Sequence, residues 1–576
     1  MRVHLNVPNL TVIVEDVGFY LEFRPRAGEV GTVEVVAYPP GSTSKPTLDP
    51  EEHCVEAFGC LGLLQLGGKT FLLVLVPPVD SIGMYDQEVE RVEEVLFYCV
   101  TDPHLLPTAH DRSHPCHHLR NVLTDGSFMY SKTFDLTSRL HTRIKVQQQR
   151  DAACTPSARD DTTIPPVPEH HRGTLEYTWN AYLLAPFNIL RTYLDPAARA
   201  AFDSRSFMLP VVEGFYGAKK VQIGGEKALL SIISRRGWGR AGTRFKKRGI
   251  DGDGSVGNFA ETETLLETTK QIVSFVQLRG SVPLYWQEKV HLAGPVTLTI
   301  SQPLTDVSLD PFLRHMGWLV DSYTAIRALS FLSDSPDGSL AAEAALGEAY
   351  GTLCDLGRAQ SKPLYSGLSF ERYSIHKAEL LSGGVAGMPE EIAKHVAATL
   401  DGFGATTATF EDGSGKYILQ TAQQGAFRVN CRDCLDRSNL GEFSISAAAL
   451  DKQLTKLGLP PLAGSELGQA HRELFSANGD ALSTIYAGSR AMNSSFIRTG
   501  RVSRLQDLEN AETSELRKVQ ALLRDGTKNR ATELLTGQYK RQEWAPKLVL
   551  VSPTPYESPS PVSETQTDGE TDEDDG

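Results

Sequence analysis

The sequence lacks a hydrophobic run long enough to cross a bilayer, and it contains few cysteines. Its most apolar stretch, residues 58–79, is interrupted by glycines, a lysine and prolines before ~18 apolar residues accumulate. The N-terminus has no apolar signal-peptide core. Only eight cysteines, irregularly spaced, occur in 576 residues, which indicates free thiols in a reducing compartment. We therefore expect a cytoplasmic protein that contacts membranes only at their surface.

Positive charge is scarce as well. The net charge is −14, but eight acidic residues and no Lys or Arg lie in residues 551–576, which leaves −6 for the rest. A mildly acidic body of this kind argues against wholesale binding to nucleic acid, and no nucleic-acid partner is expected. With 40% hydrophobic and 22% charged residues, the chain has the composition of a soluble globular protein long enough for several folding units.

The first hundred residues have the pattern of β-strands. Residues 11–14 and 32–36 are rich in β-branched side chains. Residues 61–66 and 70–76 flank a Gly-Gly pair, which predicts a hairpin. The N-terminal region is therefore predicted to be mainly β.

The remainder of the chain has a different pattern. From Phe207 onward, apolar runs and helical stretches alternate, as they do in an α/β domain. Helices are expected at residues 341–351 and 390–400, and a loop at 401–415. Residues 147–173 are polar, proline-rich and aperiodic, which predicts a surface loop.

One segment, Ala426–Asn439, carries a chemical motif. A strand-like lead-in is followed by Cys431, five residues, Arg437 and Ser438, and then by a run that permits a helix. Backbone N–H groups between Cys431 and Arg437 can cradle an anion at the helix N-terminus, and the same field favours the thiolate. Arg437 supplies a planar fork for two phosphate oxygens, and Ser438 can hydrogen-bond the sulfur. The spacing predicts in-line phosphoryl transfer to Cys431, followed by hydrolysis of the phosphocysteine.

Two carboxylates lie inside the predicted loop, an unusual place beside a phosphate. A general acid must protonate the leaving hydroxyl, and we assign Asp433 to this role. Asp436 is expected to hold the loop geometry or to orient Arg437.

The Cys431-x-x-Cys434 spacing leaves two other interpretations open. A redox pair also sits at a helix start after a strand, and two cysteines at this spacing form half of a zinc site. No second Cys-x-x-Cys exists, and the His and Cys residues at 114–118 have the spacing of no standard zinc site. We therefore expect no metal and no other cofactor.

A second cluster is strongly basic. Residues 234–250 contain seven basic side chains in seventeen positions, together with four glycines and two aromatic residues. A solvated basic loop is one interpretation of this composition. In a mildly acidic body, so local a positive patch also points to a polyanion or an anionic lipid headgroup.

Over nearly its whole length the sequence resembles the Sac-domain phosphoinositide phosphatases. Arg428–Asn439 matches their signature Arg-x-Asn-Cys-x-Asp-Cys-Leu-Asp-Arg-Thr-Asn, with Ser438 in place of Thr. Residues 310–350 match poorly. Further blocks follow in the order of the family, at residues 127–137, 179–180, 240–263, 277–286 and 478–488.

The resemblance implies a Sac fold, in which a mainly β N-terminal domain precedes an α/β catalytic domain with the Cys-x5-Arg loop. It implies metal-independent removal of phosphate from phosphatidylinositol 4-phosphate, 3-phosphate or 3,5-bisphosphate at a cytosolic membrane surface; protein partners are not predicted. By position in the family's blocks, substrate binding is expected from Arg432, Asp436, Asn439, Arg240, Arg244, Arg248 and Arg279. The alternative is a catalytically silent Sac module that binds phosphoinositides or a protein partner. The presence of Cys431, Asp433 and Arg437 argues against it.

The resemblance also divides the chain. We predict an N-terminal domain at residues 1–175, a catalytic domain at 176–545 and an acidic, disordered tail at 546–576. The sequence of residues 485–488 is similar to that of synaptojanin-like members of the family. Those members continue into a 5-phosphatase domain, which is missing here, so a stand-alone Sac phosphatase is expected.

Overall fold

The computed structural model describes most of the chain. Most of the predicted loop at 147–173 and the tail from residue 552 lie outside the described residues. The described residues are 1–6, 11–16, 18–46, 48, 53–77, 89–102, 104–133, 135–153, 176–204, 207–289, 297–411, 416–502, 510–517, 525–538 and 548–551.

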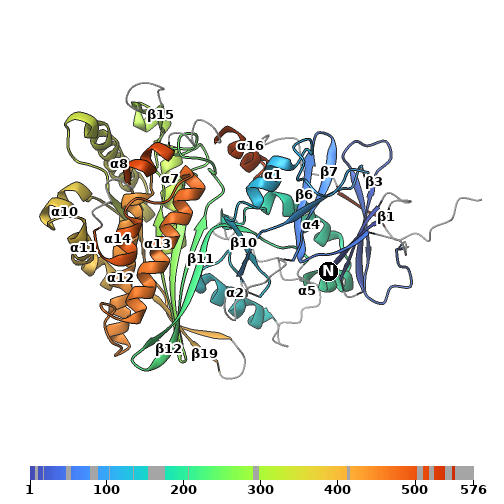
Figure 1. The fold of residues 1–576 in the computed structure, drawn as a ribbon, viewed down its shortest axis with the longest axis horizontal. Coiled ribbons are helices and arrows are strands. Elements are labelled where there is room, and N and C mark those ends of the chain that lie inside the picture. The colour runs from blue at the N-terminus through green and yellow to red at the C-terminus, as the bar shows by residue number, and fades with distance from the viewer. Residues whose placement is uncertain are drawn as a thin grey trace, which may run out of the picture.

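Two β-sheets form the N-terminal part of the molecule, at the blue end of the chain in Figure 1. The first has the strand order β22-β4-β3-β2-β1-β5, and the second has the order β6-β7-β9. The predicted hairpin is confirmed, because β6 and β7 pair antiparallel. The strands are β1 (Arg2–Asn6), β2 (Thr11–Asp16), β3 (Phe19–Pro25), β4 (Val33–Tyr38), β5 (His53–Glu56), β6 (Gly59–Leu66), β7 (Lys69–Leu75), β9 (Val95–Cys99) and β22 (Leu548–Val551).

Two segments do not follow the predicted domain boundaries. Helices α4 (Ala181–Tyr193) and α5 (Pro196–Ser204) fall in the predicted catalytic domain, yet they pack on the N-terminal strands. Phe187 of α4 contacts Phe23 edge-to-face at 6.1 Å, which buries the apolar side of the helix. Strand β22 falls in the predicted tail, but its Leu-Val-Leu-Val sequence extends the first sheet by pairing parallel with β4.

A mixed eleven-stranded sheet forms the other part of the molecule. Its order is β18-β17-β21-β14-β13-β12-β11-β10-β8, and β19 and β20 extend from β14. The loop predicted at residues 401–415 is wrong in part, because its Thr-Thr-Ala-Thr-Phe run forms β19. The strands are β8 (Val89–Arg91), β10 (Phe128–Ser131), β11 (Val212–Ile223), β12 (Glu226–Arg236), β13 (Ala260–Thr268), β14 (Gln271–Arg279), β17 (Ile326–Ser330), β18 (Leu368–Arg372), β19 (Thr406–Phe410), β20 (Tyr417–Thr421) and β21 (Ala426–Asn430); β15 (Trp286–Lys289) and β16 (Thr297–Ile300) form a separate pair.

Helices cover both faces of this sheet, as the α/β pattern after Phe207 predicts (Figure 1). One face packs against α11 (Met388–Phe403), α12 (Asp436–Lys456) and α13 (Glu466–Ala487). The opposite face packs against α2 (Leu140–Ala153), α7 (Leu309–Tyr323), α8 (Ala341–Gln360) and α9 (Lys362–Gly367). The other helices are α1 (His117–Leu123), α6 (Leu304–Val307), α10 (Ile375–Leu381), α14 (Ser494–Thr499) and α16 (Asp525–Leu535).

Three parallel strands end along one edge of the sheet. β17 lies between β18 and β21, and its last residue, Ser330, is in register with Arg372 and Asn430. Ligands of open α/β sheets bind beyond the carboxyl ends of such strands. Cys431 follows Asn430 directly, so the chemical motif begins at this edge.

Candidate functional site

The Cys431–Arg437 segment joins strand β21 to helix α12, in the predicted strand–loop–helix order. Cys434 adopts a left-handed conformation with φ of 54°, which is uncommon for a non-glycine residue and turns the loop sharply. None of the backbone N–H groups of residues 432–435 donates to the backbone of another described residue. Together with the N-terminus of the long helix α12, these groups leave donors for an anion beside Cys431.

The Cys431 side chain is buried at the start of this loop. Ser438 Oγ donates to Cys431 Sγ at 3.3 Å. Burial raises the pKa of Cys431, but a hydrogen bond from Cys434, the charge of Arg437 and the bond from Ser438 outweigh it and lower the pKa to about 6. Cys431 is therefore largely a thiolate near neutral pH, the form that acts as a nucleophile.

Arg437 is held by a residue that sequence reasoning missed. Its Nη1 and Nη2 donate to the two carboxylate oxygens of Glu343 at 2.8 and 2.6 Å, and Nη1 also donates to the carbonyl of Phe331 at 3.2 Å. Glu343 lies in the first turn of α8 and also accepts from the Ser333 N–H at 3.0 Å. This bidentate pair fixes the plane of the guanidinium beside the loop. Nothing in the local sequence of α8 distinguishes Glu343 from its other acids.

Asp433, the predicted general acid, lies between two arginines. Arg244 Nη2 donates to one carboxylate oxygen at 2.5 Å, and Arg248 Nη2 is 2.6 Å from the other. Burial raises the pKa of Asp433, but the charges of Arg244 and Arg248 outweigh it and hold the pKa far below its usual range. In this arrangement Asp433 is a carboxylate without a proton to donate. An acid role requires the two arginines to move off it.

Arg432 and Arg248 share a second buried carboxylate. Both pair with Glu288 of strand β15, through different carboxylate oxygens. Arg248 Nη1 also donates to the Arg432 carbonyl at 2.8 Å, which ties the basic cluster to the loop backbone. Asn258 reinforces this link, because its amide donates to the carbonyls of Asp433 and Cys434 at 3.3 and 3.2 Å. The basic cluster therefore supports the loop from one side.

Asp436 holds the loop from the other side. It accepts from Arg517 through both carboxylate oxygens, at 2.8 and 2.9 Å, and from the Met492 N–H at 2.6 Å. Through these contacts Asp436 links the loop to Arg517 and to the backbone at Met492. The alternative, that Asp436 orients Arg437, does not apply, because that guanidinium is held by Glu343.

Three other predicted binding residues lie beneath or behind the loop. Arg279 is fully buried, pairs with Glu442 of α12, and donates to Asn439 Oδ1 at 3.3 Å. Arg240 donates to the carbonyl of Arg248 through two nitrogens, at 3.0 and 2.7 Å. In the described structure Arg279, Asn439 and Arg240 bind protein groups, so their contribution is to support the loop.

The first residues of the basic cluster also turn inward. Arg235 and Arg236 are buried; Arg235 pairs with Glu261 and Glu263, and Arg236 pairs with Glu213. The interpretation of residues 234–250 as a solvated loop is therefore wrong for these positions, because strand β12 carries them into the sheet. Only part of the cluster, Arg244 above all, reaches the loop of residues 431–437, which is named the phosphate loop for its predicted ligand.

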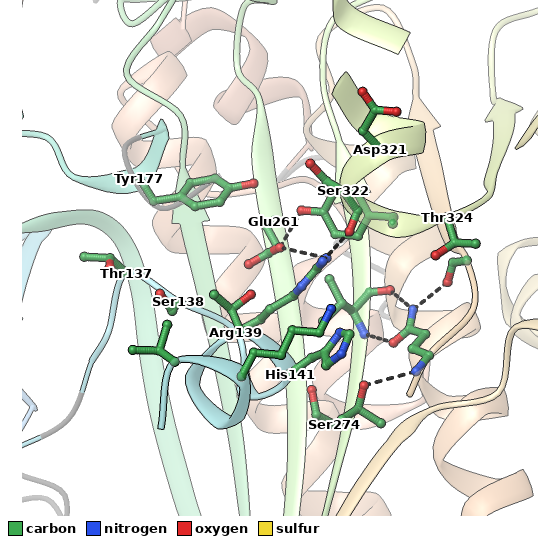
Figure 2. Close-up of a pocket in the computed structure, with 18 of the residues that line it drawn as sticks. Thr137, Ser138, Arg139, His141, Tyr177, Glu261, Ser274, Asp321, Ser322 and Thr324 are labelled. Atoms are coloured by element: carbon green, nitrogen blue, oxygen red, sulfur yellow. Dashed lines mark hydrogen bonds and ion pairs between the residues drawn. The ribbon is translucent and has the colours of Figure 1, made fainter. Parts of the chain in front are cut away.

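A separate polar cavity of about 400 Å³ lies on the other face of the sheet (Figure 2). Thr262 of β13 faces Glu442 of α12, whereas Glu263 accepts from the Leu140 N–H of α2, so successive side chains point to opposite faces. Figure 2 shows Arg139 between Glu261 and Ser322, and it donates to the Ser322 carbonyl. None of the predicted site residues lines this cavity.

The surroundings of the cysteines bear on the two other interpretations, a zinc site and a redox pair. In the described residues, no group of three or more His, Cys, Asp or Glu side chains is placed to hold a metal ion. His114 instead packs between the rings of Phe71 and Phe97, at 5.9 and 6.2 Å. The Cys434 thiol donates to the carbonyl of Cys431 at 3.4 Å, and burial raises its pKa well above the usual value. Cys434 is thus a protonated neighbour of the thiolate.

The chain is similar in sequence to known proteins over most of its length. The model of the SacI homology domain matches residues 58–379, which is more than half of the chain. The chain belongs to the SacI homology domain family of phosphoinositide phosphatases. The matched range ends before Cys431, so it does not include the phosphate loop.

Several curated proteins are similar over most of this chain. "Inositol-1,4,5-trisphosphate 5-phosphatase 1" of Schizosaccharomyces pombe is 30% identical over 507 residues, which are 84% of this chain and 43% of that protein. "Polyphosphatidylinositol phosphatase INP53" of Saccharomyces cerevisiae is 29% identical over 513 residues, 85% of this chain and 43% of that protein. "Phosphatidylinositol-3-phosphatase SAC1-B" of Danio rerio is 25% identical over 539 residues, 91% of this chain and 83% of that protein. The chain thus spans less than half the length of the two yeast proteins.

A helix needs about 20 consecutive, mainly apolar residues to cross a bilayer. Within the described ranges, no helix combines the length and the apolar content that a membrane-spanning helix needs.

Proposed function

We propose that this protein hydrolyses a phosphate ester on the inositol ring of a phosphoinositide through a phosphocysteine at Cys431. The observation that carries the proposal is a buried cysteine with a pKa of about 6, at the start of a loop that ends at Arg437 and the N-terminus of α12. Phosphoryl transfer to sulfur requires a thiolate, unpaired loop amides and a guanidinium fork at one point.

In the first step, Cys431 Sγ attacks phosphorus, the S–P bond forms, and the bond between phosphorus and the inositol oxygen breaks, which leaves that oxygen on the ring. Arg437 and the amides of residues 432–435 bind the equatorial phosphate oxygens. In the second step, water attacks the phosphorus of the phosphocysteine, the S–P bond breaks, and inorganic phosphate leaves, while the proton of the water passes to the Asp433 carboxylate that the first step left ionised. Ser438 stabilises the departing thiolate through the hydrogen bond that it already makes.

The leaving inositol oxygen needs a proton, and we keep Asp433 as its donor. Incoming phosphate carries charge that competes for Arg244 and Arg248, the two groups that hold Asp433 ionised. As these arginines turn toward the phosphate, the pKa of Asp433 rises toward its ordinary value, and the carboxyl can take up a proton.

The substrate class follows from the family and the site's charge. Phosphatidylinositol 4-phosphate, 3-phosphate and 3,5-bisphosphate are proposed substrates, in keeping with the phosphatidylinositol phosphatase names of similar proteins. Arg244 and Arg432 are partly exposed next to the loop and are placed to bind a further phosphate. We further propose that the protein acts at a cytosolic membrane surface, with residues 176–545 forming most of the catalytic domain.

The test is release of inorganic phosphate from short-chain, water-soluble phosphatidylinositol 4-phosphate in the presence of a chelator. We expect turnover by the native chain. Cys431→Ser should abolish turnover while headgroup binding is retained, because the serine hydroxyl is not ionised at neutral pH. Cys434→Ala should remain active, whereas a redox protein would lose function equally in both variants. Binding without turnover by the native chain would instead support a silent Sac module.

A further inference from the structure

Two adjacent leucines stand out on the surface of the catalytic part. Leu380 and Leu381, at the end of helix α10, are 83% and 76% exposed. Ile375 and Ala378 of the same helix are buried, so α10 is anchored in the core by one side while its end projects into solvent. Neighbouring, almost fully exposed leucines at the end of a short helix are typical of an interaction surface.

This helix end lies on the edge of the sheet that carries the phosphate loop. The Tyr373 N–H donates to the Ser330 carbonyl and the Phe331 N–H donates to the Asn430 carbonyl, both at 2.8 Å. β18 and β21 are therefore the two neighbours of β17 at this edge, about 10 Å apart by strand spacing. α10 begins shortly after β18, and Cys431 directly follows β21. Figure 1 shows α10 at the end of the molecule remote from the N-terminal sheets.

Cationic side chains line the same cavity as one of these leucines, Leu381. This cavity of about 500 Å³ beside α10 is lined by Arg372, Lys377 and Lys394, against the carboxylates of Asp334 and Glu391. Arg372 and Lys377 are exposed, and neither forms a salt bridge with another described residue. Of the acids close by, Glu371 pairs with Arg327 and His395, and Glu391 pairs with Lys394. A hydrogen bond from Ser374 and the charges of Lys377 and Arg372 lower the pKa of Asp334. The patch thus joins apolar side chains to exposed positive charge, which Asp334 offsets only in part.

We propose that this patch, Arg372, Lys377, Leu380 and Leu381, docks the protein on an anionic phospholipid bilayer. Leu380 and Leu381 insert below the headgroups, while Arg372 and Lys377 contact lipid phosphates. This arrangement turns the edge with Cys431 toward the membrane, where a phosphoinositide headgroup stands. The inference rests on the proposed function for its consequence, but the docking itself does not require catalysis.

A fluid bilayer suits this surface better than a protein partner does. A stable protein interface needs roughly 800 Å² of complementary surface on each side. Two leucines at the end of a seven-residue helix supply little of that area. Lipid chains rearrange around a small apolar tip, and anionic headgroups complement flanking cations without a matching shape.

The test is cosedimentation of the full chain with phosphatidylcholine vesicles, with and without phosphatidylserine, in the absence of phosphoinositide. We expect binding only to the phosphatidylserine vesicles, and a fall of about tenfold or more in the Leu380→Ser/Leu381→Ser variant. Arg372→Gln/Lys377→Gln should weaken binding by a few-fold and reduce its salt dependence. Leu106→Ser is the matched control, because Leu106 is 72% exposed in the N-terminal part, and it should bind as the native chain does.

Hydrolysis separates this inference from the proposed function. The leucine variant should hydrolyse short-chain, water-soluble phosphatidylinositol 4-phosphate at the native rate but lose activity on the same lipid in vesicles. Vesicle binding unchanged within about twofold in the leucine variant, or an equal loss in Leu106→Ser, would overturn the docking surface. If the native chain fails to hydrolyse the soluble substrate, the proposed function fails, while cosedimentation still decides the docking surface.

Discussion

The arginine at the sheet edge beside Cys431 differs from the one buried beneath the loop. The Arg437 side chain is 23% exposed and pairs with Glu343 at the end of the strands, whereas Arg279 is 0% exposed and pairs with Glu442 under the loop. Both guanidiniums make charge-assisted hydrogen bonds to a carboxylate. Only at the edge, however, can an incoming phosphate reach the guanidinium and compete with the carboxylate for it.

This contrast shows that charge in the sequence is a poor guide to substrate contact. Arg244, Arg248 and Arg279 all fall in family blocks and carry the same charge. Arg244 is partly exposed beside the loop, Arg248 is buried but contacts Asp433 of the loop, and Arg279 is buried beneath the loop in a pair with Glu442. A buried pair contributes little net stability, although it is costly to break. Substitutions at the edge should therefore change catalysis, and those beneath the loop should change folding.

The largest expected effect tests the edge. Arg437→Ala should lower kcat/KM for short-chain phosphatidylinositol 4-phosphate by about 10³-fold, because the phosphate loses its bidentate partner. Arg437→Lys should lower it by about 10²-fold, since a lysine keeps the charge without the fork. Initial rates of phosphate release measure both. A loss of less than about tenfold in Arg437→Ala would place the reaction elsewhere.

The next prediction concerns the buried pair. Arg279→Met should destabilise the protein by about 3–5 kcal/mol, because Glu442 is left charged and unpaired in the core. Urea unfolding measures the change, and the double variant Arg279→Met/Glu442→Met should recover much of it. Activity per folded molecule should change little. A native stability together with a large loss of activity would return Arg279 to the substrate-binding set.

Glu343 offers a smaller test of the edge. Glu343→Gln keeps a similar shape but removes the charge that opposes Arg437, and we expect kcat/KM to fall by about tenfold as the guanidinium loses its fixed plane. Glu348→Gln, an exposed position on the same helix, is the control and should behave as native. Equal rates in the two variants would show that the bidentate pair does not position Arg437.

The smallest expected effect is a shift of the pH–rate profile. Because the pKa of Cys431 is lowered to about 6, the thiolate fraction and hence kcat/KM should rise between pH 5 and 7 and level off above. Ser438→Ala removes a hydrogen bond that favours the thiolate, so the rising limb should move to higher pH. Rates should then fall a few-fold near pH 6 and little at pH 8. A limb that does not move would exclude a bond from Ser438 to the sulfur in the free enzyme.

Much of the fold was predictable from pattern alone. The hairpin at residues 61–76 and the helices around 341–351 and 390–400 follow from local periodicity, and the structure confirms them. β22 and α4 were misassigned because their packing partners lie far away in the chain. A short apolar segment reveals that it will be buried, but not against which surface.

The sequence alone determined the family and the order strand–loop–helix, and it predicted Cys431 and Arg437 as the reactive residues, because the motif depends on spacing within one short segment. Only the tertiary structure decided what surrounds them. Glu343 is 94 residues from Arg437, and Arg244 is 189 residues from Asp433. Such pairs form where strands and helices converge, and their strength depends on burial and distance, which are properties of the folded chain.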